Sequence, residues 1–195
     1  MSENLICGRS TRDFIQAIEA FHGFAAPGLV IGGLMVDWAL ERIGAGVESD
    51  AIVETYHCLP DAVQIFTPCT IGNGWLKVLD WDKFAMTIYD RWRLSGYRVW
   101  LDLGKTAAYP TIYGWYMRTI PKEELPKEEV NSTILKAGRK ILNLLPVDVV
   151  QQYERNKKGE IGICPKCREA YPLKQGTACL ACKGKGYYEL QSDAG

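Results

Sequence analysis

The first part of the chain carries apolar residues at intervals of three and four, the period of a helix that buries one face. One such helix ends at His22, and a second opens at Pro27 and runs to Ile43. Gly32 and Gly33 lie inside the second helix, where each costs about 1 kcal/mol relative to alanine. We therefore expect another backbone or a ligand to approach closely there.

Shorter apolar runs bounded by turn-forming residues follow, and these are typical of strands. The predicted strands are 51–57, 75–79, 84–89 and 97–101, with a short helix over 62–66 and a loop over 67–74. Alternation in the run 84–89 predicts one buried face. Residues 121–145 have a helical apolar stripe that Pro126 can split, while 147–153 fit a short strand or a helix equally well.

Composition narrows the class of protein. The 195 residues contain 23 lysines and arginines and 23 aspartates and glutamates, so the whole chain has no charge bias toward nucleic acid or an anionic membrane. No apolar stretch is long enough to span a bilayer, and the N-terminus lacks the basic start and long apolar run of a signal peptide. We expect a cytoplasmic protein without a membrane partner.

Two Cys-x-x-Cys pairs, separated by eleven residues, are the most specific motif of the chain. The four cysteines are Cys164, Cys167, Cys179 and Cys182. This spacing predicts a tetrahedral structural zinc site, with a rubredoxin-like iron site as an alternative. A redox dithiol needs one such pair, and a disulfide framework needs an oxidising compartment. Because protein fills all four positions, the predicted site leaves none open for catalysis.

This motif also predicts the domain organisation. Residues 1–155 are long enough for a real hydrophobic core, whereas residues 156–195 are too few to fold by apolar burial alone and need the metal. The basic and polar run 155–159 is the expected linker. The small module is predicted to be a zinc ribbon or a treble clef.

A second group of residues with metal-binding or catalytic chemistry lies in the core, at the edges of predicted elements. His22, Cys58 and Cys69 suit a zinc ion with an open fourth position, or Cys69 can be a nucleophile with His22 or His57 as its base. Asp61 can orient a histidine or simply begin a helix. The simpler interpretation is that the cysteines are small buried side chains and His22 caps a helix.

Three ordered motifs give the chain a resemblance to a known family. They are His22–Gly28, Cys58–Gln64 and Cys69–Gly74. They resemble the His-Gly-x-x-Cys-Pro-Gly turn, the Cys-x-x-Asp-Ala-x-Gln segment and the Gly-Cys-Thr-x-Gly-x-Gly loop of the family named after the E-subunit of formylmethanofuran dehydrogenase. The resemblance spans roughly residues 14–103, and some members of that family also end in a zinc-finger module.

The resemblance implies an α+β core, with an antiparallel or mixed sheet packed with helices, that dimerises and forms a metal pocket where the motifs meet. His22, Cys58, Asp61 and Cys69 match motif positions. The chain departs from the family at three places: Ala26 replaces a cysteine, Phe24 a frequent histidine and Pro68 a glycine. If the missing thiolate is a ligand in relatives, His57 is a possible substitute here.

These observations favour a metal-binding accessory or stand-alone protein, with structural zinc, a possible second divalent metal in the core, and a homodimeric state. The resemblance adds a molybdenum or tungsten formylmethanofuran dehydrogenase complex as a possible partner. The alternative is a zinc-dependent enzyme acting on a small carbonyl or one-carbon substrate through His22, Cys58 and Cys69, with loop amides of residues 70–74 receiving an anion. In the accessory interpretation, Tyr171, Tyr187 and Tyr188 form a docking face of the module or simply pack over its metal site. A zinc-ribbon nucleic-acid binder is less favoured, although the module is locally basic.

Overall fold

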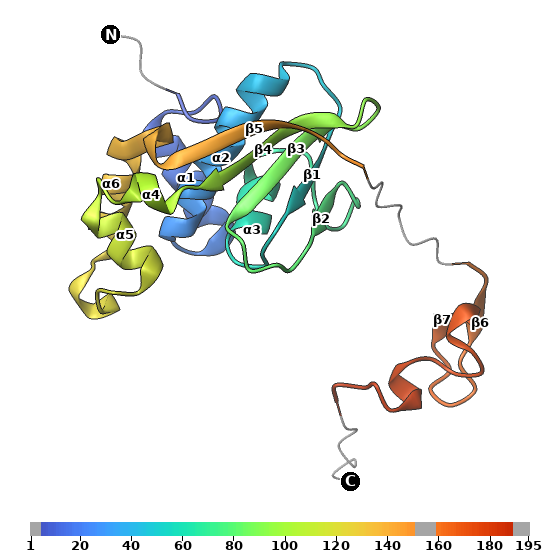
Figure 1. Ribbon diagram of the computed structural model, residues 1–195. Coiled ribbons are helices and arrows are strands. Elements are labelled where there is room, and N and C mark those ends of the chain that lie inside the picture. Colours follow the sequence, from blue (N-terminus) through green and yellow to red (C-terminus); the bar gives the residue numbers. More distant parts are fainter. Residues whose placement is uncertain (1–4, 151–158, 189–195) are drawn as a thin grey trace. The chain divides into compact units, whose positions relative to one another are not determined.

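The computed structural model describes residues 5–150 and 159–188 of the chain (Figure 1). Its internal contacts divide the chain into two compact units, residues 1–153 and 154–195. Most of the expected linker 155–159 lies outside the described residues. The two units are described separately below.

The first unit is built on a five-stranded sheet. Its strands are β1 (Ser49–Val53), β2 (Leu76–Val78), β3 (Ala85–Asp90), β4 (Ser95–Leu101) and β5 (Leu142–Asp148). They lie in the order β2-β1-β3-β4-β5, and only the β1–β2 pair is parallel. The α+β class with a mixed sheet is therefore confirmed.

The helices of this unit are α1 (Thr11–His22), α2 (Pro27–Ile43), α3 (Leu59–Phe66), α4 (Leu103–Thr106), α5 (Pro110–Met117) and α6 (Lys127–Ala137) (Figure 1). Helices α2 and α3 pack directly on strands of the sheet, and α1 and α6 pack on α2. The helix α2 contacts β3, β4, α3 and α6. Its Leu29, Ile31 and Met35 side chains are fully buried. This helix therefore lies at the centre of the hydrophobic core.

The two glycines inside α2 face side chains of neighbouring helices. A Cβ atom at Gly32 would lie 2.7 Å from the Cβ of Ala62 in α3, and one at Gly33 would collide with the ring of Phe14 in α1. The missing side chains therefore let two neighbouring helices approach α2. This corrects the expectation from the sequence, and the reason is helix packing.

Residues 121–145 contain two kinds of structure where the pattern predicted one helix. A 3₁₀ turn (Lys122–Glu124) precedes α6, and after a second 3₁₀ turn (Gly138–Ile141) the chain enters β5. Gly138 has φ 54°, which ends α6, and β5 exists because its backbone pairs with β4. The elements α4 and α5 were not predicted.

Two of the predicted strands also differ from the strands in the structure. Strand β1 ends at Val53, so His57 lies beyond it and outside any strand. Strand β3 is buried on both faces, because Thr87 and Tyr89 are covered as well as Met86 and Ile88. Tyr89 packs over Gly96 of β4, where any Cβ would collide with it. Alternation alone had predicted a single buried face.

The second unit is small. Its strands β6 (Ile161–Ile163) and β7 (Ala170–Pro172) pair antiparallel, followed by 3₁₀ turns at Leu173–Gln175 and Ala181–Lys183. Its buried residues are Cys164, Tyr171 and Ala178. So little apolar burial cannot hold this unit together without a metal. Among the described residues, no helix has the length and apolar character needed to cross a bilayer.

Candidate metal centre and core site

The first Cys-x-x-Cys pair is held by a tight turn between β6 and β7. The N–H of Cys164 donates to the Glu169 carbonyl oxygen at 2.8 Å, and the N–H of Arg168 donates to the Cys164 carbonyl oxygen at 2.9 Å. Arg168 has φ 66°, which closes the turn. In the second pair, Cys182 lies in the 3₁₀ turn Ala181–Lys183, which ends at Gly184 in the left-handed region.

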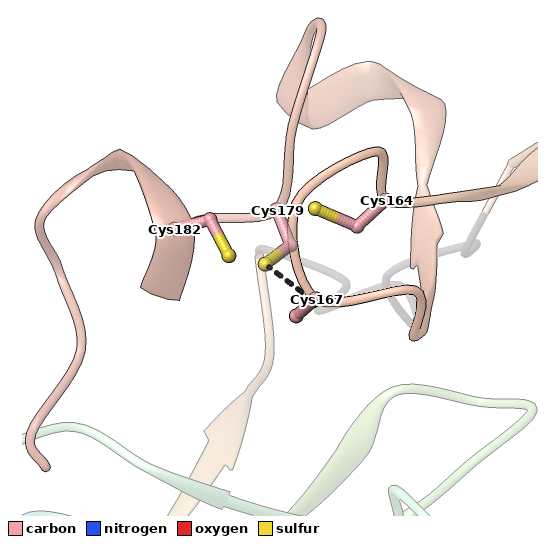
Figure 2. Close-up of side chains that lie close together, drawn as sticks. All are labelled: Cys164, Cys167, Cys179 and Cys182. Atoms are coloured by element: carbon pink, nitrogen blue, oxygen red, sulfur yellow. Dashed lines mark hydrogen bonds between the residues drawn. The ribbon is translucent and has the colours of Figure 1, made fainter. Parts of the chain in front are cut away.

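The four thiols converge on one point (Figure 2). Their sulfur atoms all lie within 4.8 Å of one another, and the Cys167 and Cys179 sulfurs are 3.8 Å apart. Zinc–sulfur bonds of about 2.3 Å in a tetrahedron place sulfurs about 3.8 Å apart. The cluster therefore fits a tetrahedral zinc ion after small adjustments of side chains, and all four ligands come from the protein.

The surroundings of Cys164 favour the thiolate form that zinc requires. Backbone N–H groups, chiefly those of Cys167 and Cys179, lower the pKa of the Cys164 thiol from 9.0 to about 6. The hydrogen bond with Cys179 is the main cause that raises the pKa of Cys182 to about 12. The thiolate form of Cys164 is thus favoured at neutral pH, whereas Cys182 must release a proton when zinc binds.

Tyr171 is not part of a docking face. It is 5% exposed, and its hydroxyl donates to the Gly176 carbonyl oxygen at 2.8 Å, so it packs inside the module. Tyr171 therefore follows the packing alternative, whereas Tyr187 and Tyr188 are exposed, at 97% and 51%. A module with few apolar residues uses its aromatic ring to cover the metal site.

In the core, the structure brings His22 and Asp61 together from the end of α1 and the first turn of α3. The Nδ1 atom of His22 lies 2.8 Å from the Asp61 Oδ2 atom, and both side chains are about one-third exposed. A carboxylate in this place fixes the imidazole orientation and leaves Nε2 for another partner. The contact suggested between Asp61 and a histidine is present, and Asp61 also lies in the first turn of α3.

Cys58 occupies a strained position before α3. Its φ is 57°, and the N–H of Leu59 donates to the His57 carbonyl oxygen at 2.5 Å across a three-residue turn. This turn places the thiol against the start of α2, where a Cβ on Gly28 would lie 2.6 Å from the Cys58 sulfur. Burial, and next the charge of Asp61, raise the pKa of this thiol, so it stays protonated near neutral pH.

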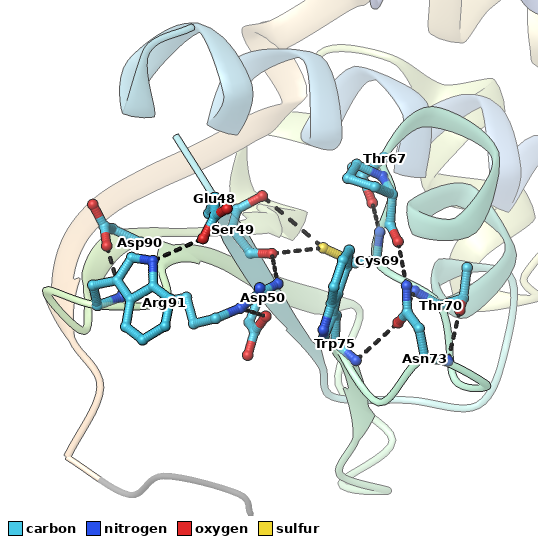
Figure 3. A network of polar contacts seen from close by, with 12 residues as sticks. Glu48, Ser49, Asp50, Thr67, Cys69, Thr70, Asn73, Trp75, Asp90 and Arg91 are labelled. Carbon is cyan, nitrogen blue, oxygen red and sulfur yellow. Dashed lines mark hydrogen bonds and ion pairs between the residues drawn. The ribbon is translucent and has the colours of Figure 1, made fainter. Parts of the chain in front are cut away.

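Cys69 lies in a different network (Figure 3). Its sulfur donates to the Ser49 carbonyl oxygen at 3.2 Å, and Arg91 binds that same carbonyl oxygen while pairing with Asp50 at 2.7 Å. The Cys69 side chain is fully buried, and burial raises its pKa. Its protonated thiol fastens the loop 67–74 to β1.

The predicted metal pocket of His22, Cys58 and Cys69 is therefore not assembled. Within the residues that the structure describes, the four-cysteine cluster is the only group of three or more His, Cys, Asp or Glu residues whose ligand atoms converge. His57 is exposed, and its N–H donates to Thr55 Oγ1 at 3.1 Å. The side chains present in the core do not fit a resident zinc ion.

Most backbone N–H groups of the loop 67–74 already donate hydrogen bonds within the protein. The N–H groups of Thr70 and Trp75 both donate to Asn73 Oδ1 at 3.0 Å, and the N–H of Ile71 donates to Gln64 Oε1 at 3.2 Å. The loop therefore satisfies these donors with its own side chains and with α3. Its polar residues are structural, which the motif pattern did not reveal.

Sequence reasoning missed two residues of α6 that contact the His22–Gly28 turn. The Nδ2 atom of Asn131 donates to the Ala25 carbonyl oxygen at 2.8 Å, and the Lys127 ammonium lies 4.1 Å from the centre of the Phe24 ring. They are one helical turn apart on α6 and about a hundred residues from the motif. No local pattern could have connected them.

An α+β core with a mixed sheet, joined to a four-cysteine module, defines the class of protein. The family model described as "FmdE, Molybdenum formylmethanofuran dehydrogenase operon" matches residues 21–151, and the FmdE treble clef zinc finger matches residues 155–189. The chain belongs to the FmdE family and ends in its treble clef. The family resemblance is thereby confirmed.

Two relatives add detail. A tungsten formylmethanofuran dehydrogenase FmdE-like protein from Syntrophus aciditrophicus is 43% identical, with a TM-score of 0.85 over 97% of this chain and 100% of that one. A protein of Archaeoglobus fulgidus named "Probable S-adenosyl-L-methionine-binding protein" is 33% identical over 91% of this chain. The chain spans about half the length of that relative, 54%.

Proposed function

We propose that this chain is a metal-binding accessory or stand-alone protein of the FmdE family, with one structural zinc ion in its treble clef. The observation that carries the proposal is the convergence of four sulfur atoms within 4.8 Å of one another. Bound zinc would supply folding stability to the module, because four protein ligands leave no position for a substrate. The core then binds partners or ligands through its own side chains.

The test is the metal content of the intact protein, measured by elemental analysis after purification and dialysis. We expect close to one zinc per chain, lost in Cys164→Ser and kept in the matched control Cys7→Ala, which removes a cysteine outside the cluster. Two metals per chain in the wild type, with one surviving Cys164→Ser, would contradict the proposal and indicate a metal site in the core.

A second candidate function is the binding of S-adenosyl-L-methionine by the core. It is supported by the Archaeoglobus relative's name, and by a site where Asp61 orients His22 beside the strained turn of Cys58. Backbone strain in a non-glycine residue is concentrated at binding and catalytic sites. Equilibrium dialysis with labelled S-adenosyl-L-methionine tests this function, and we expect His22→Ala to weaken binding.

The partners follow from the family. We propose a homodimer, and association with a molybdenum or tungsten formylmethanofuran dehydrogenase in one-carbon metabolism. The description of the matching family model supports the second of these. Light scattering coupled to gel filtration tests the first, since a mass near twice the 21.9 kDa of one chain is expected.

A further inference from the structure

The turn between α1 and α2 is where this chain departs from its family's motif, and α6 contacts the turn at those departures. Phe24 lies beneath the Lys127 ammonium at 4.1 Å from the ring centre. The carbonyl of Ala25, directly before the substituted position Ala26, accepts a hydrogen bond of 2.8 Å from Asn131. The same face of α6 supplies both contacts, because Lys127 and Asn131 are four residues apart.

Asn131 has one polar atom left without a partner. Its side chain is about nine-tenths buried, with 9% exposure, and its Oδ1 atom accepts no hydrogen bond in the part of the chain that the structure describes. A buried acceptor in this condition costs about 1–3 kcal/mol. Because Oδ1 and Nδ2 belong to one carboxamide, the free oxygen also lies beside Ala25. An N–H or O–H donor, from a water molecule or from a bound molecule, would satisfy it.

The beginning of α2, in contrast, favours a hydrogen-bond acceptor or an anionic group. Its N-cap is Ala26, which provides no side-chain hydrogen bond, and Pro27 has no N–H to offer. The positive end of this 17-residue helix is therefore uncapped by any side chain. The exposed Lys127 ammonium adds a positive charge nearby, over the Phe24 ring. Both features attract an anionic group such as a carboxylate.

We propose that this place binds a small molecule that carries a carboxylate next to an ammonium or hydroxyl group. The carboxylate lies between the start of α2 and Lys127, and the neighbouring donor satisfies Asn131 Oδ1. The Nδ2 hydrogen bond of Asn131 holds the turn in place for both contacts. The proposal rests on the ligand-binding function of the core given above and identifies which end of the ligand α6 recognises.

The experiment compares two nucleosides on the intact protein. S-Adenosyl-L-methionine has an amino-carboxylate end, whereas 5′-methylthioadenosine shares its sulfur, ribose and adenine but lacks that end. We expect Lys127→Met and Asn131→Leu each to weaken S-adenosyl-L-methionine binding at least tenfold and to change 5′-methylthioadenosine binding less than twofold. Lys136→Met and Thr133→Ala, on the same helix, are the matched controls and should leave both affinities unchanged.

Each outcome distinguishes the ligand-binding function of the core from the role proposed for α6. If the wild type binds S-adenosyl-L-methionine and the two α6 variants bind it equally well, the ligand-binding function stands and the role of α6 is wrong. If both nucleosides lose affinity equally, α6 only supports the fold of the turn, which also overturns the inference. If the wild type binds neither nucleoside, the proposed ligand-binding function itself fails, and the inference fails with it. Lys127→Met alters an exposed side chain, so it keeps the test valid should Asn131→Leu not fold.

Discussion

Replacing Gly28 by alanine tests the close contact between the Cys58 turn and the start of α2. The new Cβ would lie 2.6 Å from the Cys58 sulfur and 3.0 Å from its Cβ, about 1 Å inside an ordinary carbon contact. Neither side yields easily, because Gly28 is in a buried helix and Cys58 is fixed in a tight turn. Overpacking of this kind costs about 1–3 kcal/mol.

Alanine also favours the helix, by at most about 1 kcal/mol at an interior position and less in the first turn. We therefore expect Gly28→Ala to lower the free energy of unfolding by about 1–2 kcal/mol, which corresponds to a fall in Tm of roughly 2–8 °C for a chain of this size. The control is Gly72→Ala, where the nearest atom to the new Cβ is Thr70 Oγ1 at 3.9 Å. That variant should unfold like the wild type.

Tryptophan fluorescence during denaturant unfolding is a suitable assay. All six tryptophans lie between positions 38 and 115, so the signal reports the core and not the zinc module. The double variant Gly28→Ala/Cys58→Gly removes both colliding atoms and relaxes the positive φ of residue 58, so most of the lost stability should return. Simple addition of the two single-variant effects, or a Gly28→Ala protein as stable as the wild type, would refute the contact.

Three further results are expected. Burial, and next the charge of Asp37, raise the pKa of Cys7 from 9.0 to about 12, so the folded state prefers the protonated thiol. The stability that this preference contributes is complete below pH 9 and is lost toward pH 12. The stability of the wild type should therefore fall faster over that range than the stability of Cys7→Ala. Glu54 is 4% exposed and accepts hydrogen bonds from the Nε and Nη2 atoms of Arg98 at 2.6 and 2.8 Å. Glu54→Gln should cost about 1–3 kcal/mol in the same fluorescence assay, and a cost near zero would show that the pair contributes nothing. Removal of zinc by a chelator should make residues 160–188 sensitive to protease while the core keeps its unfolding midpoint; a core that unfolds together with the module would contradict their independence.

Several features follow from local sequence alone. Helices α1 and α2 were predicted because their apolar period and their ends are local properties, and Gly23 at φ 90° closes the first of them. The close approach of Cys164 and its three partners follows from two short turns and the cost of leaving so small a module without a metal. The three family motifs also stood in order along the chain, and the family model matches the residues that carry them.

Other features depended on residues that are distant in sequence. Residues 142–145 were predicted as helix because their apolar side chains fit a helical stripe, yet they pair with β4 as a strand. The sequence made Cys69 a candidate metal ligand, but its thiol donates a hydrogen bond to the Ser49 carbonyl oxygen. Asn131 has no motif at all and gains its place from α6 packing on α2. Local energetics decide caps, turns and periods, whereas pairing partners and the surroundings of a buried polar atom are decided only when the whole chain has folded.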